Sequence, residues 1–387
     1  MRVVVSGIGI VSSIGRNIAE TLDSLEHKRS GLNPLTLFES KYKGVLPVGE
    51  VDLPVHEEMS RTAFLGMYAA EAAFLDAKLD CRKNENLRIG FISGTSVGGM
   101  DRSEKFYSDY LYCPSKGRLR DVIGHDCGDG TEKIAKHLGI SDYLATLSTA
   151  CSSGANAIIT AARLIKNGFL DCAIAGGTDA LCKFTLNGFS SLKIVDDKIC
   201  RPFDASREGL NLGEGAGYLV LEREDNHYDK AYCSLSGYAN VCEAYHQTAS
   251  SPEGEGAYLA MAKALENAGI NPSEVDYINL HGTGTPNNDL AEGNAVKRLF
   301  GDKPPMLSST KAFTGHTLGA CGGIEAAFSA LAIQKGIVFP NLNFKTPIPE
   351  HGLIPETEFR KGLNIKTVMS NSFGFGGNMS TLIFSKL

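Results

Sequence analysis

Short runs of β-branched and other apolar residues recur along the chain, and longer segments with helical spacing of apolar residues separate them. The first pattern is typical of buried strands, and the second is typical of helices that bury one face. The predicted strands are residues 3–5, 8–11, 88–93, 143–147, 172–175, 218–222, 232–238 and 275–280. The predicted helices are residues 17–25, a run that starts at Ser60, and residues 152–167 and 255–268. This alternation predicts an α/β fold.

The second part of the chain repeats the pattern of the first. Residues 151–168 align without gaps on residues 319–336, with four identities in the same order of elements. Internal similarity of this kind indicates a duplicated unit. The charged run at residues 222–226 is the predicted connector. We therefore predict two similar halves related by a pseudo-twofold axis, residues 1–228 and 229–387.

The polar segment from residue 101 to 130 departs from the alternating pattern and carries several tyrosines. Its composition predicts a mixture of helix and loop. We expect this segment to lie near a subunit contact or a substrate tunnel.

Composition and charge exclude several classes of function. The chain has 387 residues, a net charge of −6 and no long cluster of basic residues, which excludes nucleic acid as a partner. No window approaches 18 uninterrupted apolar residues, and the N-terminus lacks the layout of a signal peptide. The ten cysteines form no C-x-x-C pair, so neither a disulfide scaffold nor a metal site is predicted. A reducing cytoplasm is the expected location.

Cys151 lies between a predicted strand and a predicted helix, within the small-residue stretch Thr149-Ala150-Cys151-Ser152-Ser153. Backbone N–H groups are unpaired at the start of a helix, and the helix dipole favours negative charge there. This position is expected to lower the pKa of the thiol and to favour a nucleophilic thiolate. The alternative is a buried cysteine that packs at the end of a strand.

Three further stretches combine reactive side chains with tight turns. His281 follows a predicted strand in His-Gly-Thr-Gly-Thr-Pro, at the strand end where α/β sheets bind ligands. Lys311 and His316 precede the helix of the second half, as Cys151 precedes the helix of the first. The glycine-rich turn at residues 371–378 offers backbone N–H groups to an oxyanion, and Phe373 and Phe375 line a predicted apolar pocket. It lacks the sequence of a phosphate-binding loop.

Together these stretches resemble the β-ketoacyl-acyl-carrier-protein synthases, and the elongating Cys-His-His branch most of all. The resemblance spans essentially the whole chain and includes Arg-Pro-Phe-Asp at residues 201–204 and Leu-Gly-Glu-Gly-Ala-Gly at residues 212–217. It implies a thiolase-like fold, with duplicated halves in α-β-α-β-α layers and mixed five-stranded sheets. The pseudo-twofold inferred from the repeat agrees with this expectation.

The resemblance also implies an acyltransferase reaction. Cys151 is expected to take an acyl chain from acyl carrier protein as a thioester. His281 and His316 are expected to stabilise the enolate formed when a malonyl group loses carbon dioxide. The enolate then attacks the acyl group on Cys151 in a decarboxylative Claisen condensation, which extends the chain by two carbons.

The remaining site residues are carried over by the same resemblance. Lys311 matches the active-site lysine of the family, and Glu325 matches an acidic residue near it that we group with the substrate-binding residues. Phe373 is expected to gate the acyl chain and to give its backbone N–H to the second oxyanion site with that of Cys151. Thr283, Thr285 and Phe375 are the other expected substrate-binding residues, and the threonines would contact the phosphopantetheine arm. The carrier protein supplies that arm, so no separate cofactor is expected.

Acyl- and malonyl-loaded carrier protein are the expected partners, with a homodimer as the first expectation and a heterodimer as the alternative. One competing hypothesis is a non-elongating subunit that determines chain length, but such subunits lack the nucleophile. Another is a degradative thiolase, which needs a second cysteine near the C-terminus, whereas no cysteine follows Cys321. The helix after Ser60 has only Arg61 as a basic residue on its leading turn. This composition suits a specialised polyene or polyketide synthase better than a housekeeping fatty-acid enzyme.

Overall fold

Two five-stranded halves form the centre of the protein in a computed structural model that describes residues 2–56, 58–82, 87–226 and 228–387. The strand order is β10-β9-β11-β12-β8 in one half and β1-β7-β6-β4-β5 in the other, and β8 pairs with β1 where the halves meet. In each half the outer three strands are parallel and the inner pairings are antiparallel. The predicted mixed five-stranded sheets are confirmed, joined at one edge into a single ten-stranded sheet.

The strands of the first half all precede residue 224, and those of the second half all follow residue 232. The first set is β1 (Val3–Ser12), β4 (Ile89–Gly94), β5 (Tyr143–Leu147), β6 (Cys172–Asp179) and β7 (Gly215–Arg223). The second set is β8 (Cys233–Cys242), β9 (Tyr277–Asn279), β10 (Met306–Ser308), β11 (Thr367–Gly374) and β12 (Asn378–Ser385). A separate two-stranded sheet pairs β2 (Leu32–Pro34) with β3 (Pro47–Gly49). The domain boundary between residues 228 and 229 stays a prediction.

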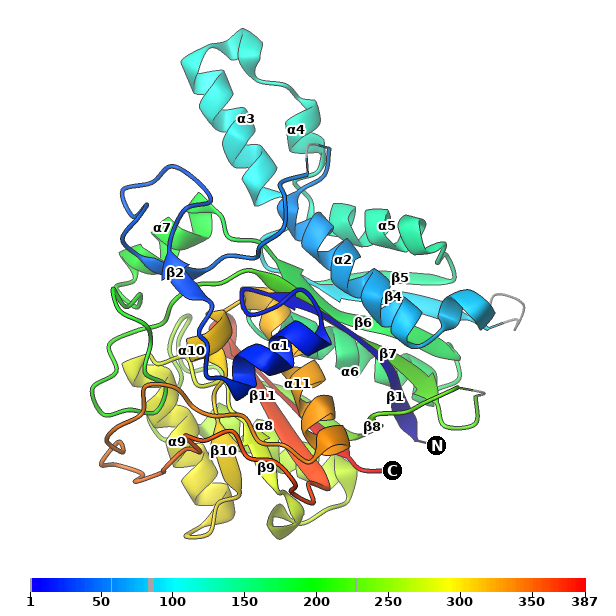
Figure 1. Cartoon of the computed structure of the whole chain (residues 1–387), viewed down its shortest axis with the longest axis vertical. Coiled ribbons are helices and arrows are strands. Elements are labelled where there is room, and N and C mark those ends of the chain that lie inside the picture. Colours follow the sequence, from blue (N-terminus) through cyan, green and yellow to red (C-terminus); the bar gives the residue numbers. More distant parts are fainter. Residues whose placement is uncertain (1, 57, 83–86, 227) are drawn as a thin grey trace.

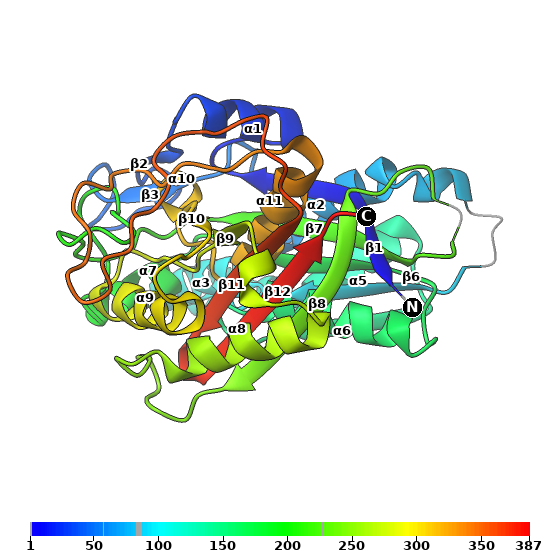
Figure 2. The ribbon, with the colours of Figure 1, turned by 90° about the horizontal axis from the view of Figure 1, so that it is seen from below.

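Helices lie between the halves and on both outer faces, which gives the predicted α-β-α-β-α layers. The inner layer is α6 (Ser153–Lys166) and α11 (Cys321–Lys335), and each packs on strands of both halves. On the outside, α2 (Arg61–Asp76) covers β1, β6 and β7, and α8 (Glu255–Ala268) covers β8 and β12. Figure 1 shows α2 on one face, and Figure 2 shows α8 below the second half. The other helices are α1 (Ile18–Glu26), α5 (Cys127–Leu138), α7 (Lys183–Ser191), α9 (Pro286–Phe300) and α10 (Lys311–Thr314).

Strand β1 is one continuous element, whereas the sequence predicted two pieces broken at Gly7 and Gly9. The glycines serve close packing instead of a turn. A Cβ on Gly9 would lie 1.9 Å from the carbonyl oxygen of Ala69, and one on Gly7 would lie 2.5 Å from that of Ala73. The backbone of α2 therefore approaches the strand closely, and a register shift between Val5 and Gly7 absorbs the irregularity.

The pseudo-twofold predicted from the ungapped alignment is visible in the backbone. The residue before Cys151 is Ala150, with φ of 53°, and the aligned residue in the second half is Leu318, with φ of 52°. Left-handed φ values are uncommon for residues with a side chain, so their recurrence at aligned positions marks the same turn in both halves. The two following helices meet at Gly154, where a Cβ would lie 2.8 Å from the carbonyl oxygen of Gly319.

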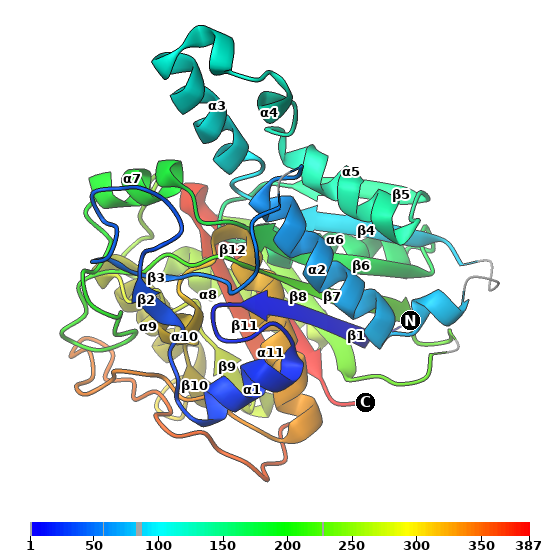
Figure 3. The same ribbon diagram turned by 45° about the horizontal axis from the view of Figure 1, so that its top comes forward.

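The segment predicted as helix and loop near residue 101 forms an arm that projects from the body. We define the arm as residues 100–123, which contain α3 (Met100–Tyr112) and α4 (Arg120–Ile123) (Figures 1 and 3). No residue of α3 is buried, and several large apolar side chains of the arm are exposed. In the described part of the chain, no helix has the length and apolar character needed to span a membrane.

Candidate active site

Cys151 follows the left-handed Ala150 in a tight turn between β5 and α6. Ser153 holds this turn, because its Oγ accepts a hydrogen bond from the Thr149 N–H at 2.9 Å and donates to the carbonyl oxygen of Ala150 at 2.6 Å. The cysteine is 4% exposed. The small residues that mark this stretch in the sequence thus allow a strained turn that presents Cys151 at the start of α6.

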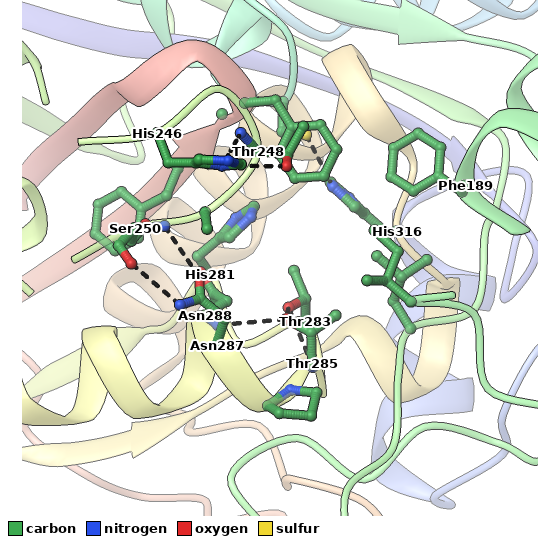
Figure 4. A pocket seen from close by; sticks show the side chains of 18 of the residues that line it. Phe189, His246, Thr248, Ser250, His281, Thr283, Thr285, Asn287, Asn288 and His316 are labelled. Carbon is green, nitrogen blue, oxygen red and sulfur yellow. Dashed lines mark hydrogen bonds between the residues drawn. The ribbon is translucent and has the colours of Figure 1, made fainter. Parts of the chain in front are cut away.

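A cavity of about 280 Å³ opens beside this turn. Seven of the predicted site residues line it: Cys151, Thr283, Thr285, His281, His316, Phe373 and Phe375. Figure 4 shows Thr283 and Thr285 near the histidines, and the Oγ1 atoms of these threonines are 2.9 Å apart. Residues 246, 248, 250, 287 and 288 add polar side chains to the wall. Structure therefore brings together residues that are more than 200 positions apart in the sequence.

His316 is hydrogen-bonded to the nucleophile. Its Nε2 lies 3.0 Å from the Sγ of Cys151 (Figure 4). Burial, together with the charge of Lys311, lowers the pKa of His316 well below its usual value, so the imidazole is neutral at pH 7. A neutral imidazole that faces a protonated thiol accepts the S–H hydrogen bond at Nε2. The backbone holds the ring in place, since the His316 N–H donates to the Asn211 carbonyl oxygen at 2.7 Å.

His281 faces His316 across the cavity, with the two rings nearly perpendicular at 86° and their centroids 5.3 Å apart. Nδ1 of His281 lies 3.5 Å from the ammonium nitrogen of Lys311. Since an ammonium group can only donate, Nδ1 is the acceptor and Nε2 carries the proton. Burial, then Lys311 and His316, lower the pKa of His281 well below its usual value. His281 is therefore a neutral Nε2–H donor.

Lys311 and Glu325 form a buried ion pair behind the histidines, with Nζ 2.5 Å from Oε1 and side chains only 1% and 4% exposed. Burial would lower the pKa of Lys311, but Glu325 keeps it above the ordinary lysine value. Glu325 does not line the cavity. Its carboxylate pairs with Lys311 instead, so the grouping of Glu325 with the substrate-binding residues stays a prediction that the cavity does not support.

The thiol pKa also differs from the sequence expectation. Burial raises the pKa of Cys151 to about 12, and this effect exceeds the opposing influence of Lys311 and of the Phe375 N–H. The helix start therefore does not by itself produce a resting thiolate. The resting pair is a neutral thiol and a neutral imidazole, and the proton must pass to His316 as the sulfur attacks.

The structure favours Phe375 for both roles that the sequence predicted for Phe373. The backbone N–H directed at the Cys151 thiol belongs to Phe375, so Phe375 is a better candidate than Phe373 for the second N–H of an oxyanion site. The ring of Phe373 is 6% exposed and packs against His281, with centroids 5.7 Å apart. The ring of Phe375 instead stacks on Phe189 at 5.6 Å in the cavity wall. The gate is better placed at Phe375.

Sequence reasoning missed the buried acids that hold the site together. Glu292 accepts hydrogen bonds from the N–H groups of His281 and Gly282, at 2.9 and 2.8 Å. Asp179 accepts hydrogen bonds from the N–H of Gly319 at 2.6 Å and from the N–H of Ser96, which follows β4. In the sequence, the neighbours of both acids are mostly apolar residues or glycine. An acidic residue among small neighbours was the only feature of the sequence that could have identified them.

Two groups of side chains with metal-ligating atoms occur among the described residues. His281, Cys321 and Glu325 place one possible ligand atom each within 4.8 Å of one another. Lys311 Nζ bonds Glu325 and approaches His281, so an ammonium group already supplies the positive charge there. A second group, Asp196, Asp197 and Glu208, is mostly exposed.

Comparison with known proteins places this site in a family. Residues 1–227 match the family model "Beta-ketoacyl synthase, N-terminal domain", and residues 232–345 match "Beta-ketoacyl synthase, C-terminal domain". The chain is 36% identical to a 3-oxoacyl-(acyl-carrier-protein) synthase 2 of Staphylococcus aureus strain MRSA252, in an alignment that covers 100% of this chain and 98% of the relative.

Two solved structures are similar over their full length. One is the ketosynthase ApeO in complex with its chain length factor ApeC from Xenorhabdus doucetiae, with 34% identity, a TM-score of 0.88 and coverage of 100% and 98%. The other is a type II polyketide acyl-carrier protein in complex with its ketosynthase bound to the hexaketide, with 28% identity, a TM-score of 0.89 and coverage of 100% and 99%. The chain belongs to the β-ketoacyl synthase family, whose members are condensing acyltransferases of fatty-acid or polyketide elongation.

Proposed function

We propose that this protein condenses an acyl group held on Cys151 with malonyl-carrier protein, extending the chain by two carbons. The observation that carries the proposal is the contact of 3.0 Å between Cys151 and His316, in one cavity with the Nε2–H donor His281. A nucleophile, a base and an oxyanion donor in one enclosed space match the needs of a two-step acyl transfer.

The first step is acyl transfer to sulfur. His316 accepts the thiol proton at Nε2 as Sγ attacks the carbonyl carbon of the acyl-carrier thioester. We assign the stabilisation of the negative charge on the carbonyl oxygen to the N–H groups of Cys151 and Phe375, and the hydrogen bond from the Phe375 N–H to the Cys151 thiol supports this assignment. The new carbon–sulfur bond remains when the carrier thiol leaves, and that thiol takes up the proton from His316.

The second step is decarboxylation and carbon–carbon bond formation. Loss of carbon dioxide from the malonyl thioester leaves an electron pair that is delocalised onto the thioester oxygen as an enolate. His281 donates its Nε2–H to that oxygen. His316 becomes the second donor when its ring, which no longer faces a free thiol, takes the neutral tautomer with the proton on Nε2 instead of Nδ1. The enolate carbon attacks the acyl carbonyl carbon, the carbon–sulfur bond breaks, and Cys151 leaves as a thiolate. The thiolate then takes up one proton from solvent, which the overall condensation consumes.

The carrier protein delivers both substrates on its phosphopantetheine arm, so the enzyme needs no cofactor of its own. Thr283 and Thr285 lie in the cavity wall beside His281, where their hydroxyl groups can bind the amides of the arm. Arg61 is not part of the docking surface, since its guanidinium forms a buried ion pair with Glu214. We place the reaction in the cytoplasm, where the nucleophile remains a thiol.

The test uses the purified protein with an acyl-loaded carrier and malonyl-loaded carrier. We expect an acyl adduct on Cys151 by intact mass and a product two carbons longer. A protein that forms no adduct and no product would instead be a non-elongating partner subunit. The acyl groups trapped on Cys151 also show whether the substrates belong to fatty-acid synthesis or to a specialised polyketide or polyene pathway.

The buried pair gives a prediction on stability and pH dependence. Lys311→Met leaves Glu325 without its cation, and we expect the free energy of unfolding in urea to fall by about 3–5 kcal/mol. Lys311 lowers the pKa of His281, so the pKa of His281 should be higher in the variant. As the pH falls, the variant should therefore lose decarboxylation at a higher pH than the wild type does.

Lys133→Met is the matched control, because it removes a partly exposed pair with Asp129. Its cost should stay below about 1 kcal/mol. An equal loss of stability in the two variants would contradict the role of the buried pair.

The arm and the edge strand β5 indicate a dimer. Exposed apolar side chains of the arm include Leu111 at 66%, Leu119 at 76% and Ile123 at 76%, and β5 adds Leu144 at 41%. β5 ends the sheet and has an unpaired edge in the chain as described. We propose that a second copy of this chain covers both.

Light scattering after size exclusion tests the dimer, and Ile123→Glu should shift the protein towards monomer by roughly tenfold or more in dissociation constant. Ile354→Glu, at a side chain 71% exposed outside the arm, is the control. A wild-type protein that is monomeric alone and dimeric only with a second ketosynthase-like chain would replace the homodimer by a heterodimer.

A further inference from the structure

Asp179 is a fully buried carboxylate at the end of β6, and no step of the proposed reaction uses it. It accepts hydrogen bonds from Thr95 Oγ1 at 2.6 Å, from the Val97 N–H at 3.0 Å and from the Gly319 N–H at 2.6 Å. The Ser96 N–H lies 3.0 Å from both of its oxygens. Burial raises the pKa of Asp179 to about 6 against the opposing effect of these donors, so the carboxylate is ionised at neutral pH and fixed in position.

Two of these donors connect Asp179 to the turns that carry the reactive residues. Ser96, whose N–H binds Asp179, donates its Oγ to the carbonyl oxygen of Ala150 at 3.1 Å, immediately before Cys151. Gly319 follows His316 by three residues and lies directly after the left-handed Leu318. Asp179 therefore ties the turn of the nucleophile in the first half to the turn of the base in the second.

The pseudo-twofold shows what kind of position the carboxylate fills. Gly319 aligns with Cys151, so the N–H that binds Asp179 is the counterpart of the N–H that serves the acyl oxyanion. β6 and β11 are equivalent eight-residue strands, and the counterpart of Asp179 is the last residue of β11, Gly374. A Cβ on Gly374 would lie 3.2 Å from the Cys151 nitrogen. The carboxylate of Asp179 thus occupies the space in front of the Gly319 N–H. The equivalent space in front of the Cys151 N–H holds no side chain, because the residue there is Gly374.

We propose that Asp179 is a positioning residue for condensation: its carboxylate permanently occupies the duplicate of the acyl oxyanion site and locks both active-site turns. The role rests on the proposed function only in taking Cys151 as the nucleophile. The fixed charge has a second consequence. The groups that act electrostatically on the Cys151 thiol are Lys311, His316, Cys321 and Asp179, and Asp179 is one that raises the thiol pKa.

The test is Asp179→Asn, with the alkylation of Cys151 by iodoacetamide measured as a function of pH and assigned by peptide mapping. Loss of the negative charge should move the pH midpoint of Cys151 alkylation to lower pH by roughly half a unit to one unit. At a fixed pH below the midpoint, this shift corresponds to about three- to tenfold more thiolate. Condensation should fall by about ten- to a hundredfold, because an amide nitrogen faces the N–H donors and the turns move. General destabilisation would expose the buried thiol and speed its alkylation at every pH, whereas loss of the charge moves the pH midpoint and leaves the rate at high pH unchanged.

Asp204→Asn is the matched control, since Asp204 is 1% exposed and accepts N–H bonds from Ser206, Lys345 and Thr346 away from Cys151. Its alkylation midpoint should equal that of the wild type. Ser96→Ala keeps the charge and lies at an exposed position, so it should fold, keep the wild-type midpoint and acylate about threefold more slowly.

The proposal is overturned if Asp179→Asn keeps both the wild-type midpoint and condensation within twofold of the wild type. If Asp179→Asn does not fold, wild-type acylation by Ser96→Ala overturns it. Alkylation needs no carrier protein, so a shift in a protein that forms no product would leave the inference on Asp179 intact and refute the proposed function alone.

Discussion

Cys151→Ala is expected to abolish condensation, with a loss of at least roughly 10⁴-fold in turnover. No other described thiol lines the cavity, so no neighbouring group can take the acyl chain. The measurement is product formation from acyl- and malonyl-loaded carrier, together with intact mass for the adduct. Cys242→Ala, at an exposed cysteine, is the control and should retain wild-type turnover. Condensation by the alanine variant at the wild-type rate would refute the nucleophile.

Cys151→Gln extends the same experiment. Its side-chain carbonyl oxygen can take the position of the acyl carbonyl oxygen, between the N–H groups of residues 151 and 375. We expect this variant to release carbon dioxide from malonyl-carrier without forming product, because His281 and His316 remain in place. Labelled carbon dioxide measures the release. This result separates the decarboxylation site from the nucleophile.

The second large effect is expected from the histidines, and the structure distinguishes two variants that the sequence treated alike. From the sequence, both His281→Ala and His316→Ala should accept an acyl group and fail to decarboxylate. In the structure, His316 Nε2 also lies 3.0 Å from a thiol whose pKa burial raises to about 12, where we propose that it acts as the base. We therefore expect His281→Ala to acylate normally and His316→Ala to acylate about 10²- to 10⁴-fold more slowly.

Both histidine variants should lose decarboxylation by about 10²- to 10³-fold, the usual effect of removing one donor to an oxyanion. Intact-mass time courses give the acylation rates, and labelled carbon dioxide gives the second step. Thr248→Val, in the cavity wall, tests whether loss of any polar wall residue has the same effect. Equal acylation rates for the two histidine variants would show that His316 does not activate the thiol.

Much of the fold could be predicted because the chain encodes it locally and twice. Apolar runs and helix caps are local signals, as with Asn17, whose side chain accepts from the Glu20 N–H as expected at the start of α1. The repeat between residues 151–168 and 319–336 predicted the symmetry, and the φ values of Ala150 and Leu318 confirm it. Helix α7 and the short strand β10 were missed because their patterns are brief. Helix α9 and the strands β11 and β12 were missed as well, and β11 and β12 include most of the stretch that was predicted as a glycine-rich turn.

The catalytic residue types were also predictable, because Cys151, His281, Lys311 and His316 each lie in distinctive small-residue stretches. The roles of Phe373, Phe375 and Glu325 were not. Which of two phenylalanines two residues apart turns its backbone N–H to the sulfur depends on the conformation of one turn, where Gly376 has φ of 81°. Glu325 could be assigned to Lys311 or to substrate until the packing of α11 was known.

The sequence by itself determined the family, the duplicated α/β architecture and the reactive side chains, because periodicity and residue type are properties of the chain alone. Tertiary structure alone decided the protonation states and the division of labour among those side chains. A pKa depends on burial and on charges from distant segments, and the neutral Cys151–His316 pair exists because the two halves enclose it. The same reason explains Asp179, whose role becomes visible only where its carboxylate meets the turn of the opposite half.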